Sequence, residues 1–507
     1  MKTLSRTQRL TVVWLVLGLG TFVVNLKHLT TMFARFEESS DFGTFFQASY
    51  QISRGHLNPY STLFEYNYPH YGFPFYASHF ELLLWVVSPL LRIFSSGLCL
   101  LVIGALAVSA TQVLASVWIT KLLQRYLTSA LAMAALVIAL IPLVYINPWY
   151  ENALYFDFHM ELLTMPLLLA CGYAYYYGHW RVSTAFAVLV ALGGDVQNTY
   201  LVALGIGLWL LDPKRNRSAL LLSVGGLFMI TMISAGHLNA ASALVVRYGY
   251  LAGGATTTAA LISGILTHPG VLLHTMISRF TIIQKFLTSA GFLGLINPLG
   301  FFVTAIVLLE PWIATDPSAF LSTFATFQDV SFQPFLTVGA AMASVFVLKR
   351  ASRWLTGAWL GVIAITLIVS VQSAKTYLPV ARAFNDTISS ANARALHQAL
   401  DLIPPRAEVI AANGVIGRFS GRPYVYPIVT VTAPLLPIWE HVTYILLTPG
   451  VGIEGVTVPQ YEAVAQALSS PTRYPHVQRV YESGSIILFK LTSRNVGYEF
   501  NLLGPAA

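Results

Sequence analysis

Apolar stretches of about 20 residues recur along this chain, and they constrain its fold more than any other feature. A helix of that length crosses a hydrocarbon core of about 30 Å. The composition agrees, because 56% of the 507 residues are hydrophobic, only 10% are charged and the mean hydropathy is +0.65. These values exclude an ordinary soluble globular protein. We therefore expect a mainly α fold, a polytopic transmembrane helical bundle.

Basic residues gather in short turns between the apolar stretches, which is typical of the cytoplasmic turns of membrane proteins. They are Lys2, Arg6 and Arg9, Lys121 and Arg125, Arg181, Lys214, Arg215 and Arg217, and Lys349, Arg350 and Arg353. With these turns inside, the pattern predicts about eleven spans, a cytoplasmic N-terminus and an extracytoplasmic C-terminal domain. Because topology accounts for the net charge of +8, we expect no nucleic-acid partner.

The pattern predicts a transmembrane domain over residues 1–374 and a C-terminal domain over residues 375–507. Spans are expected near residues 9–27, 97–120, 127–147, 162–178, 182–193, 200–211, 218–235, 282–298, 300–313, 332–348 and 354–371. The first is expected to be retained, because no small-residue cleavage site follows it. Outer loops are expected at about 28–96, 147–161 and 236–281.

Two outer segments carry more specific expectations. Residues 79–94 are too short and too interrupted to span the membrane, so they predict a helix at the interface. The tryptophan and tyrosines of residues 147–161 match an aromatic belt at the membrane surface.

The C-terminal domain has a different pattern, in which apolar and polar residues alternate between turn residues. Strands are predicted at 407–413, 423–428 and 444–448 and in a hairpin around Ser483-Gly484, with helices at 391–402 and 460–468. We expect a small α/β domain on the extracytoplasmic side. Its sequence holds neither a Gly-rich phosphate loop nor a cysteine cluster.

Carboxylates at the bilayer boundary mark candidate functional sites, and nearly all those of the transmembrane domain fall in predicted outer segments. Asp41, in "SSDFGTFFQASY", follows the first span. It opens an amphipathic stretch that we expect to lie as a surface helix along a lipid-facing groove. Its carboxylate has two compatible interpretations, a helix N-cap and a general base.

Two further acidic motifs follow. Asp157, His159 and Glu161 alternate in "FDFHMEL". In an extended segment all three project to one side, as for acid–base chemistry or a divalent metal, whereas in a helix His159 points away from the two acids. Asp195 follows two glycines in "GGDVQNT", where the backbone either approaches a ligand closely or kinks a helix.

The ordered set "DFGTFFQASYQISRGHLNPYST", "HFELLLWVVSPL", "FDFHMELL", "GGDVQ" and "ALDLIPPRAEVIAAN" resembles a family of polytopic bacterial and archaeal membrane proteins known only as a domain of unknown function. That family is similar to the GT-C glycosyltransferases. The resemblance implies transfer of a sugar from a polyprenyl-phosphate donor to a glycan, lipid or protein of the cell envelope, at the outer face of the inner (cytoplasmic) membrane. It implies Asp41 as the base, with Asp157, His159, Glu161 and Asp195 in the site.

Three positions depart from the family's pattern. Gly193-Gly194 stand where a Lys-Glu pair is usual, Phe46 replaces an acid, and Glu81 replaces a small polar residue. Because that lysine is absent, other basic side chains must bind the lipid phosphate. The candidates, chosen because they lie in outer segments, are Arg54, Arg247, Arg279 and Lys285. The transfer requires no cofactor, and a divalent metal is an optional addition.

Two other functions stay open. A lipid or solute transporter or flippase would have broken helices meeting near the midplane and an inverted repeat, and the predicted helices at 182–193 and 200–211 are short enough for the first feature. A catalytically degenerate scaffold that presents the α/β domain to a partner is favoured by the glycine pair.

Overall fold

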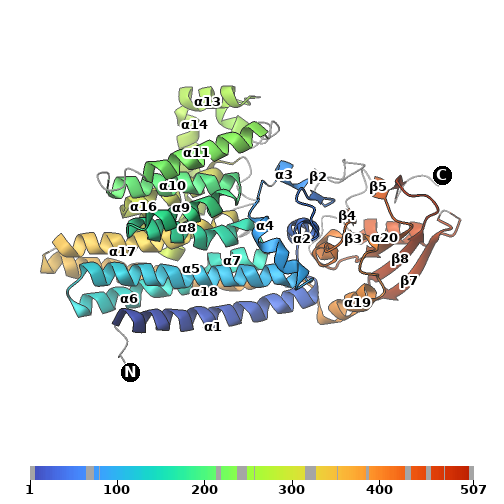
Figure 1. Cartoon of the computed structure of the whole chain (residues 1–507), viewed down its shortest axis with the longest axis horizontal. Coiled ribbons are helices and arrows are strands. Elements are labelled where there is room, and N and C mark those ends of the chain that lie inside the picture. The colour runs from blue at the N-terminus through green and yellow to red at the C-terminus, as the bar shows by residue number, and fades with distance from the viewer. Residues whose placement is uncertain are drawn as a thin grey trace. The chain divides into compact units, whose positions relative to one another are not determined.

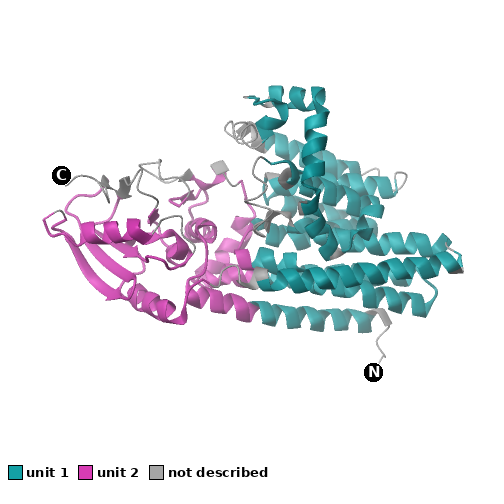
Figure 2. Cartoon of the chain, turned by 180° about the vertical axis from the view of Figure 1, so that it is seen from behind, with its two compact units in different colours: residues 1–25, 104–154, 160–381 teal, residues 26–103, 155–159, 382–507 magenta. Residues whose placement is uncertain are grey.

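The structure, a computed structural model, describes residues 6–63, 73–78, 80–212, 219–236, 248–255, 257–314, 327–350, 352–383, 387–428, 435–452, 458–472 and 474–501. These residues form a mainly helical protein with a small C-terminal sheet (Figure 1), which confirms the expected fold class. The chain divides into two compact units (Figure 2). Unit 1 comprises residues 1–25, 104–154 and 160–381, and unit 2 comprises residues 26–103, 155–159 and 382–507.

Long apolar helices form the framework of unit 1. Among the described residues, five helical segments are long and apolar enough to cross a membrane, or six if one bent pair counts as a span. The five belong to α1 (Arg6–Arg35), α5 (Leu98–Tyr126), α6 (Ala130–Tyr145) with α7 (Pro148–Phe156), α17 (Gln333–Arg350) and α18 (Arg353–Ala383). Shorter or interrupted helices complete the unit: α8 (Met160–Tyr176), α9 (Trp180–Ala191), α10 (Asp195–Leu211), α11 (Ala219–Gly236), α15 (Phe280–Ala290) and α16 (Pro298–Ile313).

Helix α17 belongs to the most buried of these five long helical segments. Every residue from Gln333 to Val345 is buried, and the helix packs against α16 and the 3-10 segment η3 (Phe292–Ile296). Asn147 donates from Nδ2 to Gln333 Oε1 at 2.7 Å, so the one polar side chain at the start of α17 is satisfied. Two other 3-10 segments of this unit are η2 (Gly249–Ala252) and η5 (Phe327–Phe332).

Two segments expected to be loops are helical. Helix α7 occupies most of residues 147–161, and its Trp149 and Tyr150 are buried. Trp149 stacks on Phe286 at 4.1 Å between ring centroids, so the expectation of an aromatic belt at the membrane surface is wrong for these rings. Residues 236–281 contain α13 (Thr258–Thr267) and α14 (Pro269–Ser278), which meet at an 81° bend. Pro269 causes the break, because it has no N–H to continue α13.

The sheet of unit 2 has the order β4-β3-β6-β8-β7. Its strands are β3 (Glu408–Ala412), β4 (Val425–Ile428), β6 (Val442–Leu447), β7 (Val477–Ser483) and β8 (Ile486–Thr492). Strand β3 pairs parallel with β4 and β6, and the other pairs are antiparallel. These strands and the helices α19 (Ser390–Asp401) and α20 (Val458–Leu468) confirm the predicted elements of the α/β fold.

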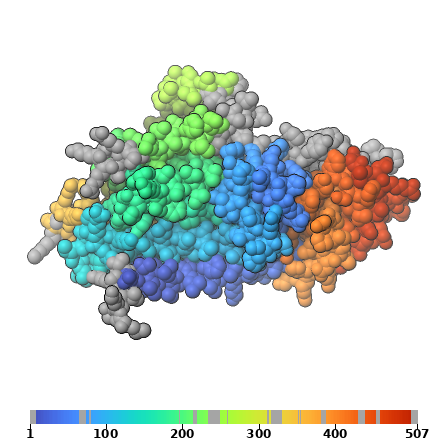
Figure 3. Space-filling model, viewed as in Figure 1, coloured from blue at the N-terminus to red at the C-terminus, as the bar shows by residue number. Residues whose placement is uncertain are grey.

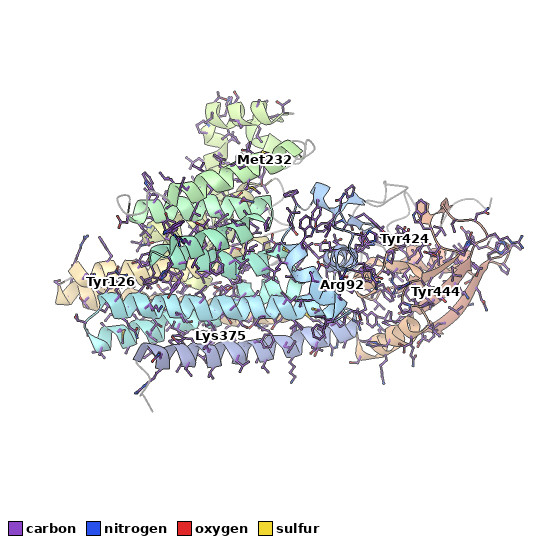
Figure 4. All side chains as sticks on the ribbon, viewed as in Figure 1. Arg92, Tyr126, Met232, Lys375, Tyr424 and Tyr444 are labelled. Atoms are coloured by element: carbon purple, nitrogen blue, oxygen red, sulfur yellow. The ribbon has the colours of Figure 1, made fainter. Side chains whose placement is uncertain are left out.

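The core of this α/β fold lies between the sheet and its helices. Ile410 of β3, Tyr444 of β6 (Figure 4), Leu396 of α19 and Val464 of α20 belong to one buried cluster. A second, two-stranded sheet pairs β5 (Leu435–Ile438) with β9 (Tyr498–Asn501) and was not predicted.

Helix α2 (Ser40–Ser53) is buried, which corrects the expected surface helix. Only Ser40, Asp41 and Tyr50 of its residues are not buried, because phenylalanines occupy more than one face. It packs against the 3-10 segments η6 (Asn413–Phe419) and η1 (Ser88–Arg92) and against α4 (Leu84–Val87). In Figure 3 the blue atoms of this region meet the orange atoms of the C-terminal segment.

The rest of the first predicted outer loop consists of short secondary-structure elements. Strands β1 (Tyr60–Ser61) and β2 (Phe73–Pro74) pair, and α3 (Phe75–Ser78) follows. Neither α4 nor η1 is long enough to span a membrane, as predicted for residues 79–94. The side chain of Gln47 in α2 donates to Thr62 Oγ1 at 2.9 Å and to the Pro423 carbonyl at 3.0 Å, so the loop is joined to the C-terminal fold.

Candidate functional site

Asp41 lies in the first turn of α2, but it is not the N-cap. That role belongs to Ser39, whose hydroxyl accepts from the backbone N–H of Asp41 at 3.1 Å and of Phe42 at 3.3 Å. The expectation of an Asp41 N-cap is therefore wrong. Asp41 is half-buried, and the positive end of the helix dipole favours a negative charge at its position.

Asp157 lies between α7 and α8 and is fully buried. Its φ of 139° is a conformation that residues with a side chain rarely adopt, so its backbone is strained. The backbone N–H of Ser39 donates to Asp157 Oδ2 at 2.7 Å, although the two residues are 118 positions apart. This bond joins the motif that follows α7 to the residue that begins α2.

Glu38 belongs to the same cluster, and both acids are buried, Glu38 with 1% of its surface exposed. Burial raises the pKa of Glu38 well above its usual range, and the negative charge of Asp157 raises it further, while Arg418 opposes both. Burial likewise raises the pKa of Asp157; hydrogen bonds from Ser39 oppose this, and the charge of Asp41 adds to it. Both carboxyl groups therefore stay neutral to a higher pH than a free carboxyl group, and Asp41 is the more exposed carboxyl group beside them.

The remaining acids and histidine are placed as follows. His159 is buried and packs edge-on against Phe45, with 5.3 Å between ring centroids. Glu161 is buried in the first turn of α8, which belongs to unit 1. Asp195 is the first residue of α10, so the predicted turn at 193–199 ends earlier than expected; its side chain lies outside the described part.

The four candidate cations have different surroundings. Arg54 is exposed at the end of α2 and stacks over Tyr50 at 4.3 Å. Arg279 donates to the carbonyls of Trp312 at 3.2 Å and Ala314 at 2.6 Å, so it stabilises the end of α16. Lys285 is half-buried in α15, and Arg247 lies outside the described residues.

Within the part of the chain that the structure describes, no three histidine, cysteine or acidic side chains are placed to hold a metal ion. Asp157 and His159 are in a short non-helical segment, and Glu161 is in the helix that follows, so the chain adopts neither regular geometry considered for the triplet. We therefore do not assign a metal to it.

Glu38 and Arg418 are the members of the site that motif reasoning left out. The sequence gives a partial signal for Glu38, which stands three residues before Asp41 in an acidic run. It gives none for Arg418, because only the fold brings residues nearly 400 positions apart into one unit.

Comparison with known proteins identifies a matching family and two solved structures that are similar to this chain. A family described as "Predicted membrane protein (DUF2079)" matches residues 36–476. Two crystal structures of ArnT from Cupriavidus metallidurans resemble the chain. The one bound to undecaprenyl phosphate has a TM-score of 0.47 and 13% identity, and the apo one has 0.43 and 12%. Each likeness covers 97% of this chain and 99% of the other. A search of curated proteins gave no match.

Proposed function

The chain belongs to the DUF2079 family of predicted membrane proteins, and on this premise we propose that it is a membrane-embedded glycosyltransferase. The donor is a sugar linked to a polyprenyl phosphate, and the acceptor is a glycan, lipid or protein at the outer face of the inner membrane. In this proposal unit 2, with its α/β fold, lies on the extracytoplasmic side.

The observation that carries the proposal is the contrast among three neighbouring carboxyl groups. Glu38 and Asp157 are buried and burial raises the pKa of each, whereas Asp41 is half-buried at the start of a helix. A general base must be ionised before it takes a proton, so Asp41 is the member suited to that role. Environments that shift the pKa values of neighbouring acids by different amounts commonly determine which acid is the base.

The transfer proceeds with inversion at the anomeric carbon. The acceptor hydroxyl oxygen bonds to the anomeric carbon while the bond between that carbon and the phosphate oxygen breaks. The electron pair of the broken bond leaves with the lipid phosphate. The hydroxyl proton passes to Asp41. The transition state resembles the oxocarbenium-like one of glycoside hydrolysis.

The other predicted residues have supporting roles in this proposal. Asp157 fixes the start of α2, and hence Asp41, through the Ser39 N–H. His159, Glu161 and Asp195 stay proposals as site residues, as do Arg54, Arg247 and Lys285 as contacts to the lipid phosphate. Arg279 is already engaged by two carbonyls, which makes it the least suited of the four cations.

The test is Asp41→Asn in detergent-purified full-length protein, assayed with radiolabelled polyprenyl-phosphate sugars and isolated cell-envelope acceptors. We expect transfer to fall by roughly a hundredfold or more, as for loss of a general base, with an unchanged unfolding midpoint. Asp401→Asn, at an exposed end of α19, is the matched control and should retain activity. Full activity in purified Asp41→Asn overturns the assignment.

One observation favours a transporter or flippase instead. The 81° break between α13 and α14 resembles the discontinuous helices of transporters. Uptake of a labelled lipid or solute into proteoliposomes, with no transfer in detergent, would support that function. A scaffold without catalysis predicts that amide variants of Asp41 and Asp157 leave the cellular phenotype unchanged.

A further inference from the structure

Three side chains of the site keep buried polar atoms that bond to nothing in the described part of the chain. They are both carboxyl oxygens of Glu38, Oδ1 of Asp157 and Nε of Arg418. A buried polar atom without a partner is destabilising, because no hydrogen bond replaces the ones it made with water. Native proteins keep only a few such atoms per hundred residues, and here four belong to one cluster, which points to a ligand at this place.

The backbone holds these groups together. Arg418 follows Gly417 in η6, and a Cβ on Gly417 would lie 2.8 Å from Glu38 Cβ and 2.7 Å from the Ser39 carbonyl oxygen. Glycine is required at this close approach, and Arg418 is thereby placed beside the start of α2. Asp157 reaches the same place through its bond from Ser39.

Aromatic stacking orients the guanidinium of Arg418. Its Cζ lies 3.5 Å from the ring centroid of Phe33 and 5.7 Å from that of Phe36. A guanidinium stacked on a ring lies parallel to that ring, so its N–H groups point outward in the guanidinium plane and can donate at the edges. Its buried Nε bonds to no described residue, so Arg418 is oriented with that donor still available.

The charges around the cluster favour a ligand with a single negative charge. Arg418 is its one cation, while Asp41 and Glu37 are anions that act on Asp157 and Glu38. Glu37 is engaged elsewhere, since it accepts from the Ile388 N–H at 3.2 Å and faces Arg35 at 4.0 Å. In their neutral forms the two acids donate rather than repel, so the cluster presents O–H and N–H donors, and Arg418 is its positive centre.

We propose that Glu38, Asp157 and Arg418 form an oxyanion-binding site for the singly charged phosphate of the lipid-linked donor. Arg418 supplies the charge, and the two carboxyl groups each donate an O–H to a phosphate oxygen. The ligand is an acceptor-only anion, because a guanidinium cannot accept from a hydroxyl. This inference rests on the proposed function and adds to it that the α/β fold contributes a residue to the reaction centre.

The site makes binding depend on pH in a defined direction. As pH rises through the raised pKa values of Glu38 and Asp157, each group loses its O–H and gains a negative charge. Affinity for the phosphate therefore falls with rising pH. Glu38→Gln keeps a neutral donor at every pH, so this variant should retain its affinity further into the alkaline range than the unaltered protein.

The test measures binding of a short-chain polyprenyl methyl phosphate, a diester that keeps one negative charge, to the full-length protein in detergent by titration calorimetry across a pH series. Arg418→Gln should weaken binding by roughly tenfold or more, as for loss of a charged hydrogen-bond donor, and Arg418→Lys should restore part of it. The matched control Arg394→Gln removes an exposed arginine of α19 and should bind normally. Thermal unfolding verifies that each variant is folded.

Two arms separate the alternatives. If inorganic phosphate competes with the lipid, the site binds phosphate in either form. If it does not compete, and Arg418→Gln still binds the lipid weakly, the site binds the lipid headgroup alone. Unchanged affinity in folded Arg418→Gln, together with an unchanged pH profile in Glu38→Gln, overturns the inference. Asp41→Asn should still bind lipid phosphate, because it leaves Arg418 in place, so an inactive Asp41→Asn and a normal Arg418→Gln would leave the proposed function standing without this site.

Discussion

Glu408 is the buried carboxyl group through which pH should control the stability of the C-terminal sheet. It begins β3 and is fully buried. Its oxygens accept from the backbone N–H of Trp439 and of Glu440 at 3.1 Å, and from Thr443 Oγ1 at 2.8 Å. These bonds fasten the turn between β5 and β6 to the sheet.

The magnitude follows from the pKa. Burial raises the pKa of Glu408 from 4.5 to about 7, although three hydrogen bonds oppose the shift. A shift of about 2.5 units at 1.36 kcal/mol per unit is about 3 kcal/mol. Because the folded-state pKa is the higher one, the contribution is fully present below pH 4.5 and is lost as pH rises to about 7.

The perturbation is Glu408→Gln, which removes the titration and keeps most of the hydrogen-bond geometry. Native-state hydrogen exchange of β3 and β6, read by mass spectrometry, gives the opening free energy of each protein at about pH 4 and pH 8. The variant's stability relative to the unaltered protein should increase by about 3 kcal/mol over this range, a change of about a hundredfold in the ratio of exchange rates.

The intrinsic rate of amide exchange changes with pH by the same factor in both proteins, so it cancels when their exchange rates are compared at one pH. Glu462→Gln, at an exposed position of α20, is the matched control and should show a constant difference. A constant difference for Glu408→Gln as well would refute the reasoning, because it would mean that Glu408 ionises alike in the folded and unfolded chains.

Two backbone predictions complete the set. Ser39→Ala removes the N-cap of α2 and should cost about 1 kcal/mol by chemical denaturation, whereas Ser39→Gly should cost only a few tenths; equal losses would contradict the capping role. Gly194→Ala places a Cβ at a φ of 119° and should cost about 1–3 kcal/mol. Its control, Gly225→Ala within α11, has open space around it and should be neutral or stabilising, and a Gly194→Ala variant as stable as this control would contradict the strain.

The sequence predicted the helices and strands that follow from a pattern of apolar residues within the element itself. Apolar length gave the long helices, and alternation gave the strands of the five-stranded sheet. It failed for α2 and α7, whose mixed composition favours a membrane surface when read alone. Both are buried because neighbours distant in sequence cover their polar faces, as Thr62 and Pro423 cover Gln47. The pairing of β5 with β9 is equally non-local.

The candidate site was predictable to the extent that its chemistry lies in short motifs. Asp41 and Asp157 were chosen as separate acids, and both belong to unit 2. What no motif could supply is the raised pKa of Asp157, because that depends on burial and on the charges that the fold assembles. Arg418 lies beyond motif reasoning for the same reason. Phe46, which departs from the family's acid, is buried and packs on Phe42 at 5.8 Å.

The glycine pair before Asp195 has a packing cause, and this bears on whether the site is degenerate. A Cβ on Gly193 would lie 2.5 Å from Thr164 Cγ2 and 3.0 Å from Gln197 Cγ. Thr164 Oγ1 donates to Gln197 Oε1 at 2.6 Å, so that contact is fixed. Gly194 caps α10 in a conformation that only glycine adopts without strain. Packing and backbone conformation therefore account for both glycines, and the pair by itself is no argument for an inactive scaffold.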